Sequence, residues 1–209
     1  MDLLFWQYSE DENGLGEWNQ VAFDKLDKNS QKAVEAFAKT EAGYELLSPF
    51  ANEGDKIGSV EFKTKGVNSD HNFGFFEYDY DGAAYGQADI RLGKENASFD
   101  LRLNIGRQTK DNNAESMAVT IGHESFIHLN RYIKKIINAY NNGDYAELKK
   151  LMNQFGKEGQ THGKGDHDGY IEKKVEYQKM YDFLTQLKSV LNPQEVNNQI
   201  KKHDAKYKK

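Results

Sequence analysis

The stretch AESMAVTIGHESFIHLNRYIKKIINAY, residues 114–140, decides how this sequence folds. It contains no proline, and its apolar residues recur at helical spacing. We therefore predict one long, largely buried helix here. The apolar positions are Met117, Val119, Ile121, Phe126, Leu129, Ile133, Ile136 and Ile137.

At the centre of this helix stands the segment His123-Glu124-Ser125-Phe126-Ile127-His128. Two histidines beside a glutamate on one helix are typical of zinc hydrolases, in which the imidazoles hold the metal and the glutamate takes a proton from water. A buried glutamate is costly unless it has a partner. We predict that His123 and His128 are metal ligands and that Glu124 is a general base.

The spacing of the two histidines differs from the usual i and i+4. Residues i and i+5 lie about 140° apart around a regular α-helix, so His123 and His128 would diverge. A single-turn π-bulge takes up one extra residue and brings i and i+5 onto one face. The metal hypothesis therefore predicts a helix defect at this segment.

A catalytic zinc site needs a third protein ligand and one open position. The glycine-rich segment THGKGDHDGY, residues 161–170, offers His167 as the first choice, with Asp166 or Asp168 orienting an imidazole. We assign Tyr170 the role of hydrogen-bond donor to a developing oxyanion. The alternatives for the third ligand are His162, Glu147, Glu172 and Glu176.

The sequence before the motif predicts helices followed by a sheet. Residues 27–51 are typical of a helical pair that is broken at Gly43 and ends near Pro49. Alternating apolar and polar residues then predict four antiparallel strands, at residues 57–62, 73–80, 88–92 and 99–105. After the motif helix, helices are expected at residues 145–155 and 170–191, with a loop at residues 156–169.

These elements predict one α+β domain over residues 1–209, with a zincin-like arrangement of sheet and motif helix. Its parts are an N-terminal helical region at residues 1–55, an antiparallel sheet at residues 56–106 and a helical region with the metal site at residues 114–200. A chain of 209 residues is the length expected of a single core.

Composition restricts the classes of partner and of metal ligand. The formal net charge of −5 argues against nucleic acid as the main partner. The absence of cysteine leaves His, Asp, Glu and water as metal ligands. Neither a signal peptide nor a membrane span is expected, so the chain is predicted to be soluble, although it could be part of a larger exported protein.

Two resemblances extend this interpretation. The HEXXXH pattern at residues 123–128 is similar to the zinc motif of the dipeptidyl-peptidase III family, over six residues only. The segments FAKTEAGY (residues 37–44), FANEGDKIG (residues 50–58) and IGHESFIH (residues 121–128) resemble C-terminal domains of Rhs-repeat-associated proteins of Bacteroidetes. That resemblance implies a metallopeptidase toxin delivered within an exported protein, with a cognate immunity protein as partner.

The resulting hypothesis is a zinc-dependent hydrolase, a peptidase that cleaves a protein or peptide substrate. The strand at residues 99–105 directly precedes the motif helix, and its edge could hold an extended peptide. Two alternatives stay open: a non-catalytic binding domain with a structural histidine site, and a metal-dependent nuclease or amidase.

Overall fold

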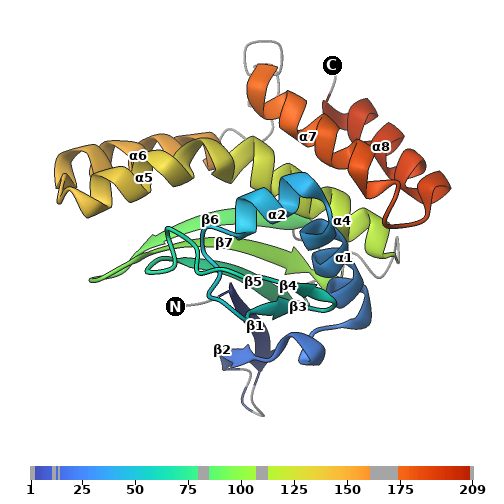
Figure 1. The fold of residues 1–209 in the computed structure, drawn as a ribbon, viewed down its shortest axis with the longest axis horizontal. Coiled ribbons are helices and arrows are strands. Elements are labelled where there is room, and N and C mark those ends of the chain that lie inside the picture. The colour runs from blue at the N-terminus through green and yellow to red at the C-terminus, as the bar shows by residue number, and fades with distance from the viewer. Residues whose placement is uncertain are drawn as a thin grey trace.

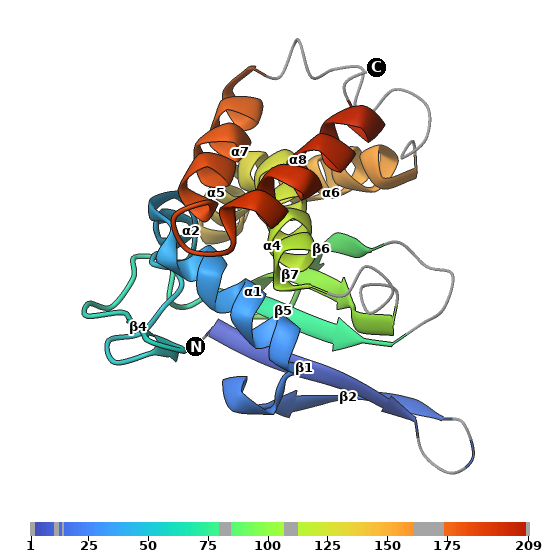
Figure 2. The same cartoon turned by 90° about the vertical axis from the view of Figure 1, so that its right-hand side faces the viewer.

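The computed structural model describes residues 3–10, 13, 15–79, 85–106, 113–160 and 174–207. Helices cover one face of a five-stranded sheet, as Figures 1 and 2 show from two directions. The strands are β1 (Leu3–Glu10), β2 (Gly16–Val21), β5 (Asn72–Tyr78), β6 (Gly86–Leu92) and β7 (Ala97–Asn104). The helices are α1 (Lys28–Lys39), α2 (Glu41–Leu47), α4 (Ala114–His123), η2 (Glu124–Leu129), α5 (Asn130–Asn141), α6 (Tyr145–Gln160), α7 (Lys174–Leu187) and α8 (Pro193–Tyr207), besides the short η1 (Phe23–Lys25).

The sheet has the strand order β2-β1-β5-β7-β6. The central pairs β1–β5 and β5–β7 are parallel, and the outer pairs β1–β2 and β7–β6 are antiparallel. The predicted sheet of four antiparallel strands is therefore a mixed sheet of five strands, in which only the outer pairs are antiparallel. Parallel strands in the middle of a sheet are buried on both faces, which agrees with the nearly continuous burial of β5 and β7.

Two of the five strands come from a region predicted to be helical. Strands β1 and β2 pair with each other as an antiparallel hairpin, so the helical assignment for residues 1–55 holds only from residue 23 onwards. The strand predicted at residues 57–62 is outside the main sheet. It forms a separate two-stranded hairpin, β3 (Lys56–Ile57) with β4 (Val60–Glu61).

The predicted helical pair is present as α1 and α2, but its break is at Thr40 and not at Gly43. Thr40 has extended backbone angles, and its hydroxyl accepts the N–H of Gly43 at 3.0 Å, which caps α2. A threonine that ends one helix and caps the next allows a sharp turn between them. Gly43 is inside the new helix.

The long helix predicted for residues 114–140 is confirmed as the continuous run α4, η2 and α5. Helix α6 continues to Gln160, so residues 156–160 are helical although a loop was predicted there. The rest of that predicted loop lies outside the described residues. Figure 1 shows α5 and α6 side by side, extending beyond the sheet on the left, and their many mutual contacts agree.

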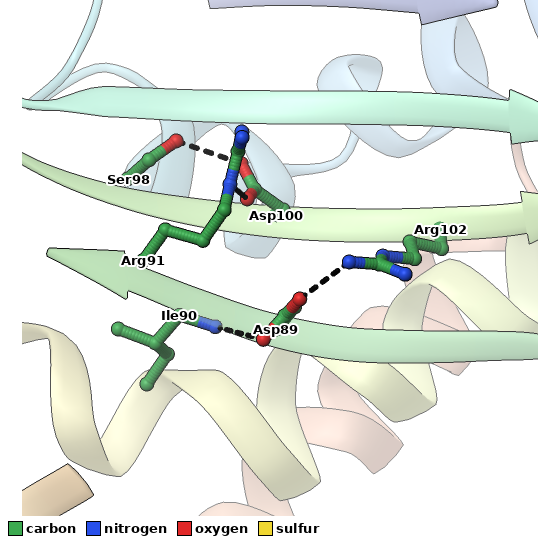
Figure 3. Close-up of polar contacts among 6 residues, drawn as sticks. All are labelled: Asp89, Ile90, Arg91, Ser98, Asp100 and Arg102. Carbon is green, nitrogen blue, oxygen red and sulfur yellow. Dashed lines mark hydrogen bonds and ion pairs between the residues drawn. The ribbon is translucent and has the colours of Figure 1, made fainter. Parts of the chain in front are cut away.

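The second face of the sheet carries ion pairs between neighbouring strands (Figure 3). Arg102 contacts Asp89 at 2.6 Å and Arg91 contacts Asp100 at 2.5 Å, both joining β7 to β6. These residues alternate along their strands with core residues such as Leu101, so they lie on the face away from the core. The second face of the sheet is therefore polar where β6 and β7 pair.

Candidate metal centre

The predicted helix defect is confirmed at the His-Glu-His segment. Residues Glu124–Leu129 form a π-helix between α4 and α5. At its end the N–H of Asn130 donates to the carbonyl of Ser125, five residues earlier. This i to i+5 hydrogen bond places residues five apart one above the other.

Both histidine side chains consequently lie on one face of the helix. Nε2 of His128 is 3.2 Å from Nε2 of His123, and the ring centroids are 5.0 Å apart with an interplanar angle of 67°. Two nitrogens bound at about 2.1 Å to one tetrahedral zinc would be separated by roughly 3.4 Å. The nitrogen pair therefore has the separation that a shared metal ion requires.

The glutamate between the histidines completes a buried group of three. One ligand atom from each of His123, Glu124 and His128 lies within 4.8 Å of the others. Their exposed fractions are only 3%, 6% and 7%. Buried imidazoles and carboxylates need partners. The group could hold a metal ion.

The carboxylate of Glu124 is positioned by the sheet. Its Oε2 accepts the backbone N–H of Ala88 in β6 at 3.0 Å. Strand β6 is one of the two outer strands and pairs only with β7 among the described strands. The bond therefore joins the sheet edge to the π-helix, and it orients the proposed base.

Two glycines permit the close packing around this helix. A Cβ on Gly86 of β6 would lie 2.5 Å from Thr120 Cγ2, so only glycine lets the strand approach α4 this closely. A Cβ on Gly122, next to His123, would lie 2.2 Å from the Phe183 ring of α7. Strand and helix thus hold the motif from two directions.

The prediction that the strand at residues 99–105 offers a free edge for substrate is wrong. The strand predicted at residues 99–105 is β7, and it lies between β5 and β6, so neither of its edges is exposed. Its long apolar run reflects this central position. The outer strand beside the metal group is β6.

Sequence reasoning also missed the groups that β6 contributes, the Ala88 amide and Gly86. A backbone N–H has no signature in a sequence. Gly86 had one, because a glycine at the start of an alternating strand often marks a close backbone approach.

None of the other residues proposed for the site is found in the metal group among the described residues. Glu147 lies in the first turn of α6, where its carboxylate accepts Lys150 Nζ at 2.9 Å, and it is not part of the metal group. The side chain of Glu176, in α7, is outside the described part of the chain. The remaining predicted residues also lie outside the described residues: His162, Asp166, His167, Asp168, Tyr170 and Glu172.

The electrostatic effect of Glu124 extends to the end of β5. Burial raises the pKa of the Tyr78 phenol above its usual value of 10.0. The positive charge of Arg102 opposes this rise in pKa, and the negative charge of Glu124 adds to it. Tyr78 therefore stays neutral near physiological pH and keeps its O–H as a donor.

Comparisons with family models, with curated proteins and with solved structures found no match for this chain. Within the described residues, no helix has the length and apolar character that crossing a bilayer requires.

Proposed function

We propose that this chain is a zinc-dependent hydrolase, a peptidase of zincin-like design, in which His123 and His128 hold the metal and Glu124 is the general base. The observation that supports it most is the 3.2 Å separation of the two Nε2 atoms across a π-bulge, beside a buried carboxylate. A π-bulge interrupts regular α-helical hydrogen bonding and is frequent at functional sites. Here the π-bulge places the two imidazoles on the same face of the helix.

Zinc is the metal that this donor set favours. Imidazole nitrogens bind Zn²⁺ well, whereas Ca²⁺ and Mg²⁺ prefer sites built from oxygen atoms. The chain has no cysteine, so a structural site made of thiolates is impossible. We keep His167 as the proposed third ligand, which would leave one coordination position open for water or substrate.

Bound zinc would supply a Lewis acid that polarises the substrate carbonyl and lowers the pKa of water. The chain's own groups supply the proton transfers. Glu124 accepts the proton of the attacking water and donates it to the leaving amine. The Ala88 N–H, 3.0 Å from Oε2, keeps the carboxylate directed along the β6 edge during both transfers.

Strand β6 is the proposed support for the substrate. An extended peptide can add to an exposed sheet edge through backbone hydrogen bonds. The β6 edge faces outward and its Ala88 amide already reaches Glu124, so a peptide paired with β6 would pass the general base. A polypeptide substrate and a toxin role, as the Rhs resemblance implies, are consistent with this arrangement.

The test is elemental analysis of the purified chain and of matched histidine variants. We expect about one zinc per chain in the wild type and none in His123→Ala or His128→Ala. His71→Asn is the matched control, because His71 is equally buried but lies outside the metal group. A wild type that binds no zinc, and whose melting temperature zinc does not raise, would refute the proposal.

Hydrolysis is tested separately with fluorescein-labelled casein as the probe. Glu124→Gln should retain zinc but lose about a hundredfold to ten-thousandfold in rate, the usual contribution of a general base. His167→Ala tests the third ligand, and loss of zinc in this variant is the expected result.

The burial of all three groups favours one alternative, a binding domain with a closed structural metal site. In that case zinc would be held by four protein ligands, and Glu124→Gln would alter neither zinc content nor function. Cleavage of casein by the wild type and its loss in Glu124→Gln would exclude this alternative.

A further inference from the structure

The hairpin of α5 and α6 is basic in an otherwise acidic protein. Residues 130–160 contain three acidic side chains, Asp144, Glu147 and Glu158, and six basic ones. The hairpin therefore carries +3, and the remaining residues carry −8, since the two add to the net charge of −5. The basic residues are Arg131, Lys134, Lys135, Lys149, Lys150 and Lys157.

Four of these lysines are available to a partner. Lys134, Lys135, Lys149 and Lys157 are all exposed, and none of them forms an ion pair with a described residue. Lys150, by contrast, is paired with Glu147 at 2.9 Å. Four of the six positive charges of the hairpin are thus without an ion pair among the described residues.

The two helices place these charges along one projecting element. The rings of Tyr132 and Phe155 are 5.5 Å apart, which sets the antiparallel register of α5 and α6. By this register Lys157 lies level with the start of α5, and Lys149 lies nearer the tip, about 12 Å further along at 1.5 Å per residue. Figure 1 shows the hairpin lying above β6, with its tip past the end of the sheet.

We propose that the α5–α6 hairpin is a docking surface for an acidic protein. A long polyanion such as nucleic acid would extend beyond the hairpin and be repelled by the −8 of the remaining residues. A compact acidic protein, in contrast, could contact the hairpin without approaching the acidic remainder of the molecule. Tyr145, 80% exposed beside the tip, supplies an aromatic side chain of the kind enriched at protein interfaces.

The partner would also lie near the candidate metal centre, since α5 begins directly after the π-helix. The docking proposal does not require the centre to be catalytic. It depends on charge and exposure alone, and the two proposals can fail independently.

Two charge-matched variants test it. The hairpin variant replaces Lys134, Lys135, Lys149 and Lys157 by Gln, and the control variant replaces Lys28, Lys32, Lys63 and Lys65, which are also exposed and without an ion pair among the described residues. Both variants lower the net charge from −5 to −9, because each loses four positive charges. Circular dichroism and melting temperature establish that both are folded.

The probes are fluorescein-labelled poly-L-glutamate short enough to lie on the hairpin, about ten residues, and a single-stranded DNA long enough to extend beyond it, at about 20 mM salt where screening is weak. We expect the wild type and the control variant to bind poly-L-glutamate alike, and the hairpin variant to bind about tenfold more weakly. Equal binding by the two variants, tighter binding to DNA than to poly-L-glutamate, or no binding by the wild type would each overturn the proposal.

Discussion

The segment of β5 with the residue before it, and the π-helix, both bury a histidine and a glutamate, yet these side chains have different roles in the two places. His71, directly before β5, and Glu77, near the end of β5, are 3% and 4% exposed, as deeply buried as the metal group. His71 Nδ1 accepts the Ala97 N–H at 3.0 Å, so its Nε2 carries the proton and donates to Asn141 at 3.3 Å. Both ring nitrogens are thereby engaged in joining β7 to α5.

Glu77 is satisfied in the same way. Its carboxylate accepts the backbone N–H of Asp27 at 2.9 Å and the side-chain amide of Gln7 at 2.9 Å. These bonds fix the start of α1 on the sheet. In the π-helix, by contrast, the two imidazoles face each other at 3.2 Å beside a carboxylate. Burial alone therefore does not identify a functional side chain, and convergence of several on one point is the better criterion.

The largest effect is expected from removing one member of the convergent group. Zinc in about thousandfold excess over its dissociation constant should stabilise the wild type by roughly 4 kcal/mol. His128→Ala should lose this stabilisation entirely, and His71→Asn should keep it. Chemical denaturation with and without zinc measures both. Equal zinc stabilisation of the His128→Ala variant and the wild type would contradict the assignment of His128.

The second contrast is between the two glutamates. Glu77→Gln should lower the free energy of unfolding by about 2–4 kcal/mol, because an NH₂ group replaces one acceptor and a buried charged hydrogen-bond network is broken. Glu124→Gln should change it by less than about 1 kcal/mol, since the remaining oxygen can still accept the Ala88 N–H. Urea denaturation of the two variants compares them directly. A larger loss in Glu124→Gln would mean that Glu124 is mainly structural.

The π-bulge itself can be removed by deleting Ser125. This side chain is fully buried and its hydroxyl has no hydrogen-bond partner among the described residues. Deletion gives the sequence His-Glu-Phe-Ile-His, whose histidines are four apart and share one face of a regular α-helix. We expect α4 and α5 to keep their register and the free energy of unfolding to rise by about 1 kcal/mol, as an unsatisfied buried hydroxyl is removed.

If the Ser125 deletion variant retains zinc, then zinc binding requires the two histidines on one helix face. The π-bulge would then be needed only because the histidines are five residues apart. Denaturation and elemental analysis of the deletion variant give both answers. An unfolded or zinc-free deletion variant would show that the bulge positions more than the two histidines.

Some of these features could be predicted from the sequence and others could not. The defect at His123–His128 was predictable, because two ligands five apart can converge only on a widened turn. The structural role of Glu77 was not, because its donors, Asp27 and Gln7, lie 50 and 70 residues away. The strands β1 and β2 were missed for the same reason. The strand character of a short apolar segment depends on its pairing partner, and the partner of β1 is β5, far away in the sequence.

The smallest effect concerns a carboxylate nearer the surface, Glu35 of α1. Hydrogen bonds from Lys39 and then from the Ser59 hydroxyl and N–H lower the pKa of Glu35 from 4.5 to about 2. A lowered folded-state pKa means that the stabilisation is complete above the unfolded value of 4.5 and is lost as pH falls towards 2. Because the side chain is 25% exposed, solvent screening reduces the contribution to about 1 kcal/mol.

Glu35→Gln should remove this component of acid sensitivity, leaving the variant about 1 kcal/mol less stable than the wild type at pH 6 and equal to it near pH 2. Urea denaturation at several pH values measures the difference, and Glu45→Gln, an exposed carboxylate of α2, is the control that should follow the wild type. A constant difference between Glu35→Gln and the wild type from pH 6 to pH 2 would show that packing, and not charge, joins Glu35 to the β3–β4 hairpin. Glu35 would then stabilise the fold through packing contacts, whereas Glu77 and Glu124 accept hydrogen bonds that fix their carboxylates.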